Sequence, residues 1–317
     1  MLGSILDTVL DRTVLAGYTN VGYRLRSLRW APDELGSMQG RTVLVTGATS
    51  GLGQAAAEGF ARHGATVWLL ARDESRGERA RASVDGAGGE AHLALCDLAD
   101  LGSVRRFAER FAGEASRLDV LVNNAGVLPL RRTLSADGIE LTFAVNVVAP
   151  FLLTKLMLEM LERGAPSRVV NVSSGGMYSQ RLRADDLQFE RSDFDGTVAY
   201  ARSKRAEVIL TEMWAQRLKG AGVAVHAMHP GWADTPGVQS SLPRFYKLTK
   251  PLLRTPEQGA DTIVWLGGAE AAGRSSGGFW HDRRRRPTHL LRRTRETEAD
   301  RELLWRECER LSGGAGV

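Results

Sequence analysis

Short apolar runs alternate with longer stretches in which apolar residues recur at helical spacing along most of the chain. The short runs are rich in β-branched residues and predict buried strands, whereas the longer stretches predict amphipathic helices. The predicted strands are Arg41–Thr46, Thr66–Leu70, Ala91–Leu95, Val120–Val122, Val169–Val172 and Val223–Met228. The predicted helices include Gln54–His63, Leu101–Phe111, Gly138–Leu161, Tyr200–Leu218 and Glu257–Leu266. This alternation predicts an α/β fold with a doubly wound parallel sheet of about seven strands and helices on both faces.

A separate apolar pattern precedes the first predicted strand. Apolar residues from Leu2 to Tyr18 recur at near-helical spacing, with Asp7, Asp11 and Arg12 on the other side, and predict an amphipathic helix. The acids, and the absence of a run of about eighteen apolar residues, argue against a signal peptide and a membrane span. We expect this helix to pack on the domain or on a partner; the alternative is peripheral attachment of residues 1–29 to a membrane surface.

Composition indicates one globular unit between two extensions. The chain has 317 residues and 43% hydrophobic content, enough for a full core. We predict a helical extension over residues 1–39, a domain over residues 40–290, and a basic, then mixed-charge tail over residues 291–317. The formal net charge is +5, yet residues 283–295 hold seven arginines and no acid, which leaves −2 for the rest. Without interleaved aromatic residues, this segment is expected to be a solvated tail and no specific nucleic-acid site, and residues 296–310 an exposed helix.

The cysteines indicate the cellular compartment. Cys96 and Cys308 show no spacing typical of a metal site, so we predict no metal and a reducing compartment. We therefore expect a cytoplasmic protein, with peripheral membrane association as the alternative. A homo-oligomer stays open.

A glycine-rich turn joins the first predicted strand to its helix. Glycines at 47, 51 and 53 allow the backbone to turn tightly and to approach a pyrophosphate, whose charge then meets the free N–H groups of the helix N-terminus. Polar residues or turn formers also follow the other strands. Because the carboxyl ends of parallel strands share one edge, we expect them to line a common site there. These residues are Asp97, Asn123, Ser174 and Pro230.

Tyr200 and Lys204 lie four residues apart in a predicted helix, which places a phenol and an ammonium on one face. A free tyrosine titrates near a pKa of about 10, and a neighbouring ammonium stabilises the phenolate and lowers that pKa. The pair can therefore act as an acid/base at neutral pH. By itself the spacing is common, and an exposed helix pair is the ordinary interpretation.

The order of these motifs resembles that of short-chain dehydrogenases/reductases. The resemblance rests on Thr46-Gly47-xxx-Gly51-x-Gly53, Asn123-Asn124-Ala125-Gly126, Asn146, Ser174, Tyr200-xxx-Lys204 and Pro230-Gly231. It implies a Rossmann-type fold of the single-domain branch and spans about residues 18–290. Segments such as Ser173–Met177, Phe194–Thr197 and Met228–Val238 are more closely similar to the member-12 type of dehydrogenase/reductase SDR proteins, related to the retinol-dehydrogenase-like group.

The resemblance implies roles for individual residues. The implied catalytic residues are Asn146, Ser174, Tyr200 and Lys204. The implied cofactor-binding residues are Gly47, Thr49, Ser50, Gly51, Leu52, Gly53, Arg72, Asp97, Leu98, Asn123, Ala125, Gly126, Tyr200, Lys204, Pro230, Gly231 and Thr235. In the family the lysine also binds the nicotinamide ribose, and the asparagine matching Asn146 holds a water that links the lysine to solvent.

Simpler interpretations stand beside some of these roles. Ser174 can cap the following turn, Asn146 can be a satisfied helix asparagine, and Asp97 can cap the helix that begins near Leu101. A base function for His229 is not expected, because the tyrosine already supplies it and a histidine at a strand end is more often structural.

The end of the second strand bears on the choice of cofactor. A carboxylate there binds both ribose hydroxyls of NAD, whereas an arginine pairs with the 2′-phosphate of NADP. That place holds Ala71 followed by Arg72, so NADP(H) is the preferred cofactor. The competing interpretation is that Asp73 reaches the ribose, in which case NAD(H) is used.

Two long loops are expected to form the substrate wall. They span residues 175–199, with Met177, Tyr178, Leu187, Phe189 and Phe194, and residues 232–255, with Val238, Leu242, Phe245, Tyr246 and Leu248. Their apolar content favours a lipid-, retinoid- or steroid-like ketone, aldehyde or alcohol, although ordinary packing explains it equally well. We predict an oxidoreductase that transfers hydride between nicotinamide and such a substrate. The alternative is a non-catalytic NADP(H)-binding scaffold for a partner protein.

Overall fold

An eight-stranded sheet forms the centre of the chain in the computed structural model, which describes residues 17–31, 35–241 and 243–313. The strand order is β3-β2-β1-β4-β5-β6-β7-β8; the first seven strands are parallel, and β8 is antiparallel to β7. The strands are β1 Thr42–Thr46, β2 Thr66–Ala71, β3 Glu90–Leu95, β4 Val120–Asn123, β5 Ser167–Val172, β6 Val223–Met228, β7 Gly278–His281 and β8 Arg284–Arg286. The doubly wound fold predicted from the apolar pattern is therefore confirmed, with one strand more than expected.

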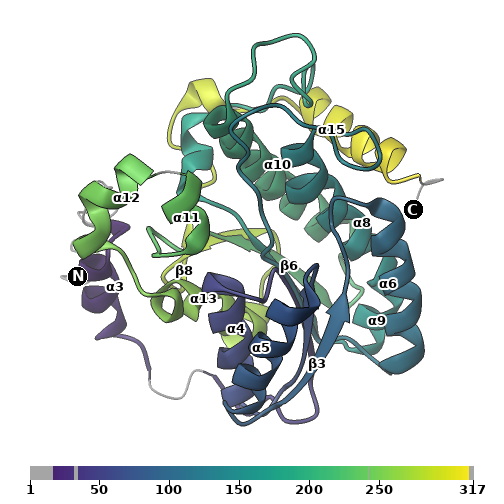
Figure 1. Ribbon diagram of the computed structural model, residues 1–317, viewed down its shortest axis with the longest axis vertical. Coiled ribbons are helices and arrows are strands. Elements are labelled where there is room, and N and C mark those ends of the chain that lie inside the picture. The colour runs from purple at the N-terminus through teal and green to yellow at the C-terminus, as the bar shows by residue number, and fades with distance from the viewer. Residues whose placement is uncertain (1–16, 32–34, 242, 314–317) are drawn as a thin grey trace.

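Helices cover both faces of the sheet (Figure 1). α4, α5 and α13 pack on one face, and α6, α8, α9 and α10 pack on the other. Their bounds are α3 Asn20–Ser27, α4 Gly51–Arg62, α5 Glu74–Asp85, α6 Leu101–Glu114, α7 Leu141–Phe143, α8 Ala149–Leu156, α9 Leu158–Arg163, α10 Gly196–Arg217, α11 Pro236–Ser241, α12 Pro243–Thr249, α13 Pro256–Gly268, α14 Glu270–Gly273 and α15 Glu298–Leu311. Central strands such as β4 and β6 are buried along their whole length, because neither face meets solvent.

The strand order reverses beside β1. From β1 the sheet runs through β2 to β3 on one side and through β4 to β8 on the other. The helices that follow β1 and β4 therefore leave on opposite faces, and a crevice opens between the carboxyl ends of these two strands. The glycine-rich turn and the Asn123–Gly126 turn both lie at this point.

The predicted helix over residues 138–161 is shorter and interrupted. It begins at Leu141, passes through a π-helical turn at Ala144–Val148, and continues as α8 and α9. A π-helical turn carries one extra residue and is frequent at functional sites. Here the extra residue falls beside Asn146.

The C-terminal part is more ordered than we expected. Arg284–Arg286 extends the sheet as β8, and Arg283 pairs with Asp261 at 2.7 Å, so the prediction of a tail is wrong for this part, although Arg284 and Arg285 are exposed to solvent as expected. The predicted terminal helix exists as α15, but it is not simply exposed. Trp305 is 3% exposed, with its ring centroid 4.7 Å from that of Trp214 on α10. The apolar side of α15 therefore packs on the domain and extends its core.

The N-terminal segment is described only from residue 17. The amphipathic pattern predicted before it lies outside the described residues, and α3 follows as a short helix. None of the helices in the described ranges is both long enough and apolar enough to cross a bilayer.

Candidate active site

The glycine-rich turn leaves no room for side chains. Gly47 and Gly51 have φ of +64° and +55°, a region that other residues rarely adopt. A Cβ on Gly53 would collide with the carbonyl oxygen of Gly47 and lie 2.5 Å from Nδ2 of Asn124. The turn is thus a close-fitting backbone cradle.

The N-terminus of α4 opens into this cradle. Its N-cap residue, Ser50, makes no side-chain capping bond to the first helical N–H groups. Such groups, together with the helix dipole, favour an anion. The cradle therefore fits the pyrophosphate of a dinucleotide.

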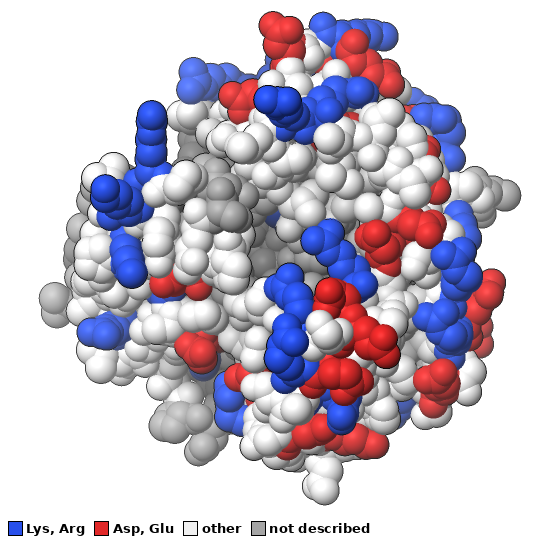
Figure 2. All heavy atoms as spheres, viewed as in Figure 1, with Lys and Arg blue, Asp and Glu red and all other residues white. Residues whose placement is uncertain are grey.

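A cleft of about 360 Å³ continues from the cradle along the strand ends. Most of the predicted cofactor residues line it, and Figure 2 shows the face hollowed in the region where α4, α10 and α11 surround the strand ends in Figure 1. The predicted residues in the lining are Gly47, Thr49, Ser50, Leu52, Gly53, Arg72, Asp97, Leu98, Ala125, Gly126 and Thr235. Its other residues are Leu70, Ala71, Cys96, Ala99, Asn124, Val127, Leu141 and Val145.

Asn123 is placed differently from our expectation. Its side chain is 4% exposed and donates to Oδ1 of Asn171 at 2.9 Å, inside the domain. The neighbouring Asn124 lines the cleft instead, and its Nδ2 donates to the carbonyl oxygen of Thr46 at 2.9 Å. Oγ1 of Thr46 accepts in turn from the N–H of Asn124 and Ala125. Thr46 and Asn124, to which sequence reasoning gave no cofactor role, therefore fix the two turns to each other.

The two acids near the strand ends have separate tasks. Asp73 caps α5, because its Oδ1 accepts from the N–H of Arg76 at 2.8 Å and from Oγ of Ser75 at 2.9 Å. The backbone bond from Arg76, then the bond from Ser75, lower the pKa of Asp73. The simpler interpretation, that Asp97 caps α6, is wrong. Asp100 caps this helix, and Asp97 lines the cleft.

The segment after β6 meets the glycine turn through Thr235. A Cβ on Gly51 would lie 3.2 Å from Cγ2 of Thr235, so these two segments of the chain touch across the cleft. Pro230 and Gly231 are absent from the described lining of the cleft. A Cβ on Gly231 would lie 2.5 Å from Nε of Arg254, and the carbonyl oxygen of Pro230 accepts from Nη1 of Arg254. Their close neighbour is therefore this arginine.

Tyr200 and Lys204 project from α10 as the spacing predicted. Nζ of Lys204 lies 5.6 Å from the centroid of the Tyr200 ring. The lysine is 2% exposed and donates to the carbonyl oxygen of Val172, at the end of β5, at 2.9 Å. A Cβ on Gly126 would lie 3.5 Å from Nζ. The phenol and ammonium thus lie where β4 and β5 end.

Glu207 is a buried partner of Lys204 that sequence reasoning missed. Its Oε1 accepts from Nζ of Lys204 at 2.5 Å, and both side chains are almost fully buried. Burial raises the pKa of Glu207 to about 7, although the lysine opposes the shift. Burial alone would lower the pKa of Lys204, but Glu207 and Tyr200 together outweigh it and the pKa is raised. The ammonium beside Tyr200 is therefore shared with an acid.

Asn146 lies in the π-helical turn and is fully buried. Its Oδ1 accepts from the N–H of Val127 at 2.8 Å, and its Nδ2 donates to the carbonyl oxygen of Val127 at 3.1 Å and to Oγ of Ser203 at 3.0 Å. The side chain therefore fixes the end of the Asn123–Gly126 turn to α10. A Cβ on Gly126 would lie 3.5 Å from its Oδ1, so Asn146 also adjoins the lysine site.

Ser174 stands at the end of β5 and precedes a 3₁₀ turn. Its Oγ accepts from the N–H of Gly176 at 3.2 Å, so the capping role weighed from the sequence is present. That bond occupies a lone pair and leaves the hydroxyl able to donate. Oγ of Ser173 donates to the carbonyl oxygen of Lys204 at 2.8 Å, which joins this turn to α10.

His229 is buried in a stack of rings. Its ring lies 3.8 Å from that of His281, nearly parallel, and its Nδ1 accepts from the N–H of Gly231. Burial, and then the neighbouring His281, hold its pKa well below the ordinary range. A neutral, stacked histidine agrees with a structural role.

The loop over residues 175–199 packs largely on the domain. Met177 is fully buried and Phe189 is 5% exposed, so ordinary packing explains these two members of the expected wall. Oη of Tyr178 donates to the carbonyl oxygen of Pro287 at 2.6 Å, after β8. The side chains of Val238, Leu242 and Phe245 in the other loop lie outside the described part.

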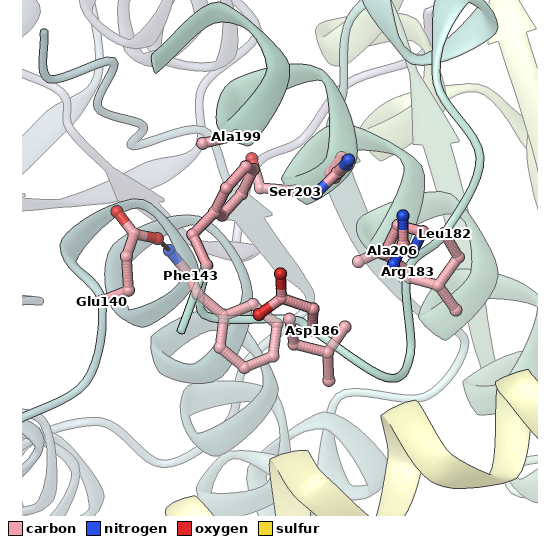
Figure 3. A pocket seen from close by; sticks show the side chains of 11 residues that line it. Glu140, Phe143, Leu182, Arg183, Asp186, Ala199, Ser203 and Ala206 are labelled. Carbon is pink, nitrogen blue, oxygen red and sulfur yellow. Dashed lines mark hydrogen bonds between the residues drawn. The ribbon is translucent and has the colours of Figure 1, made fainter. Parts of the chain in front are cut away.

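A second cavity of about 10 Å³ lies between this loop, α7 and α10 (Figure 3). It has room for about one water molecule. Asp186 accepts from backbone N–H groups of its own loop, and Glu140 accepts from those of Thr142 and Phe143. Both carboxylates are thereby occupied in local structure, and we assign no catalytic or binding role to this cavity.

Comparison with known proteins agrees with this geometry. The family model described as short chain dehydrogenase matches residues 41–244. Dehydrogenase/reductase SDR family member 12 of Bos taurus is 44% identical over 94% of this chain and 95% of the relative, and retinol dehydrogenase 12 of Homo sapiens is 38% identical over 86% and 87%. A solved complex of Pseudomonas aeruginosa RhlG with NADP in its active site is 26% identical, with a TM-score of 0.65, over 79% of this chain and 96% of that chain.

The Rossmann-type fold and the family match lead to one assignment. Most of the glycine-turn residues line one cleft with Ala125 and Gly126, and Lys204 on α10 adjoins Gly126. The chain belongs to the short-chain dehydrogenase/reductase family and is an oxidoreductase acting on CH–OH or C=O groups with NAD(P).

Proposed function

We propose that this chain is an NADP(H)-dependent oxidoreductase for an apolar ketone or aldehyde, or for the corresponding alcohol in reverse, with Tyr200 as the general acid/base. The observation that carries the proposal is the position of Lys204. Its buried ammonium lies 5.6 Å from the Tyr200 ring, beside the strand ends that line the dinucleotide cleft. A cation there stabilises the phenolate that remains after proton transfer.

The side chains supply a proton and hold the reacting oxygen. NADPH, when bound in the cleft, would supply the hydride for the carbonyl carbon. Ser174 donates a hydrogen bond to the carbonyl oxygen as negative charge develops there. Tyr200 then gives that oxygen its proton, and Lys204 stabilises the phenolate. In the oxidative direction, the phenolate takes the hydroxyl proton of the alcohol, and the hydride from its carbon would pass to bound NADP⁺.

Arg72 supports the choice of NADP(H). It is exposed, follows β2 and lines the cleft, where a guanidinium can pair with a 2′-phosphate. The competing residue, Asp73, is occupied as the cap of α5. We expect Arg72→Ala to reduce the preference for NADPH over NADH by at least about tenfold in kcat/KM, the loss of one charge-assisted contact.

Asp73→Asn is the matched control for Arg72→Ala, because asparagine caps helices equally well but carries no charge. It should leave the use of both cofactors unchanged. If Asp73→Asn weakens NADH and Arg72→Ala changes nothing, the carboxylate binds the ribose and the preference is for NAD(H).

The apolar substrate class rests on the relatives of this chain that are named retinol dehydrogenases. A panel of long-chain and retinoid aldehydes should therefore oxidise NADPH faster than small polar carbonyls do.

Tyr200→Phe tests the mechanism. The substitution keeps the ring and removes the proton, so kcat should fall about 10²–10⁴-fold while NADPH binding, followed by fluorescence, stays within a few-fold. Equal turnover by wild type and variant would rule out Tyr200 as the proton donor. Cofactor binding without any turnover in wild type would favour the scaffold interpretation.

A further inference from the structure

The segment Gly17–Thr19 runs against the substrate side of the domain. The carbonyl oxygen of Tyr18 accepts from the N–H of Trp232 at 2.8 Å and from Nε of Arg254 at 3.1 Å. These two residues bound the loop over residues 232–255, and the N–H of Arg254 donates to the carbonyl oxygen of Trp232. The N-terminal segment is therefore bonded to both ends of this loop.

Buried charges hold the segment in place. Arg254 is 1% exposed and forms two bonds, of 2.6 and 2.9 Å, to the carboxylate of Asp282, which is 2% exposed. Arg26 donates to the same carboxylate at 2.7 Å and to the carbonyl oxygen of Gly17 at 2.9 Å. Nη2 of Arg254 also donates to Gly17 at 2.9 Å.

Such a cluster is stable only if its donors find acceptors. Removing two guanidinium groups from water costs several kcal/mol per ion, which the carboxylate and further hydrogen bonds must offset. The carbonyl oxygens of Gly17, Tyr18 and Thr19 supply those further bonds to Arg254. The segment is thus a fixed part of this edge of the domain and completes the cluster.

The ring of Tyr18 lies against the active site. A Cβ on Gly175 would be 2.6 Å from Cε2 of Tyr18 and 3.2 Å from its hydroxyl oxygen, so the ring rests on the backbone that directly follows Ser174. On its other sides it packs on His229 at 4.6 Å and Trp232 at 6.2 Å between ring centroids. Glycine at 175 provides the space that the ring occupies.

The surroundings of this ring are uncharged on the histidine side. Burial holds the pKa of His229 well below the ordinary range, and burial lowers the pKa of His281 to about 3. Tyr18 itself is only partly buried. Together the rings form an aromatic surface beside Ser174.

We propose that Tyr18 is a specificity-determining residue that forms the wall of the substrate site next to Ser174 and binds the apolar body of the substrate. The proposal rests on the proposed function, since it assigns a wall to that same site. Its chemical consequence is selectivity for carbonyl compounds whose apolar chain extends beyond the reacting group. A ten-carbon chain offers this surface far more apolar area than a propyl group does.

The test compares decanal with propanal as substrates of the full chain with NADPH. Tyr18→Ala should raise KM for decanal at least about tenfold while kcat and KM for propanal stay within about twofold, because the long chain has far more contact area to lose. Tyr18→Phe keeps the ring and should restore the KM for decanal. Leu28→Ala is the matched control, since Leu28 follows α3 in the same N-terminal part and is 82% exposed.

Each outcome decides the proposal. Equal changes for both aldehydes, or no change for decanal, would overturn the wall while leaving the enzyme assignment intact. Absence of turnover of any aldehyde by wild type would remove the proposed function and the wall with it. If Tyr18→Ala does not fold, Tyr18→Val carries the same comparison, because it keeps a small apolar side chain but removes most of the contact area of the ring.

Discussion

Glu207→Gln measures how the buried ion pair affects stability. In the folded chain, burial raises the pKa of Glu207 to about 7, against an ordinary value of 4.5. Between these two pH values the folded chain holds a proton that the unfolded chain has released, so the free energy of unfolding falls as pH rises. At roughly 1.4 kcal/mol per pKa unit, this loss amounts to about 3 kcal/mol. Glutamine does not titrate and abolishes it.

The assay is equilibrium urea unfolding of wild type and Glu207→Gln between pH 4.5 and pH 8. The substitution also breaks the bond to Lys204 and thereby shifts stability by a constant amount, so the decisive quantity is how the difference changes with pH. As pH rises across this range, the free energy of unfolding of the variant should increase by about 3 kcal/mol relative to that of wild type. Glu212→Gln is the matched control on α10, because Glu212 pairs with Arg301 but is 27% exposed.

A difference between wild type and Glu207→Gln that stays constant with pH would refute the reasoning. It would mean that Lys204 fully compensates the burial of the carboxylate. Both side chains of the pair would then be ionised throughout this pH range, and the Glu207 carboxylate would balance the charge of the Lys204 ammonium next to Tyr200.

Two further substitutions probe the cradle and the C-terminal helix. Gly53→Ala should abolish NADPH binding in a fluorescence titration, because its Cβ collides with the carbonyl oxygen of Gly47. Gly113→Ala on α6 is the control and should bind NADPH normally, because a Cβ at that position has no neighbour within 4 Å. Normal binding by Gly53→Ala would contradict the cradle. Trp305→Ala should lower the free energy of unfolding by about 3–5 kcal/mol in urea, as for other buried aromatic residues. Leu303→Ala on the same helix, where the side chain is 44% exposed, should cost far less, and equal losses would show that α15 is not docked through Trp305.

Local patterns predicted most of the fold. β1 to β6 follow from apolar runs, which are largely buried except in the edge strand β3, and the glycine turn follows from residues that alone tolerate its backbone. β7 and β8 escaped prediction because they are short and contain His281 and Arg284–Arg286, whose polar side chains hide the strand pattern. The break around Asn146 escaped because the segment is apolar on nearly all sides, so a shift of one residue leaves no trace in the apolar pattern.

The site was predicted where one motif carries it and missed where distant segments meet. Tyr200 and Lys204 lie on one helix, so their spacing sufficed. The spacing of Lys204 and Glu207 was also visible, but three residues apart on a helix usually means a solvated surface pair, and only burial gives it weight. Tyr18 reaches the residue after Ser174 through long-range packing that no local pattern encodes.

The anchoring of Gly17 also sets an order for folding during synthesis. Gly17 lies 237 residues before Arg254, whose guanidinium holds its carbonyl oxygen, and Asp282 follows later still. At roughly 5–20 residues per second, a ribosome needs about 12–47 s to bridge that distance. The segment Gly17–Thr19 therefore waits for nearly the whole chain to emerge before it can dock, and the edge of the domain formed with Arg254 and Asp282 is the last part to be completed.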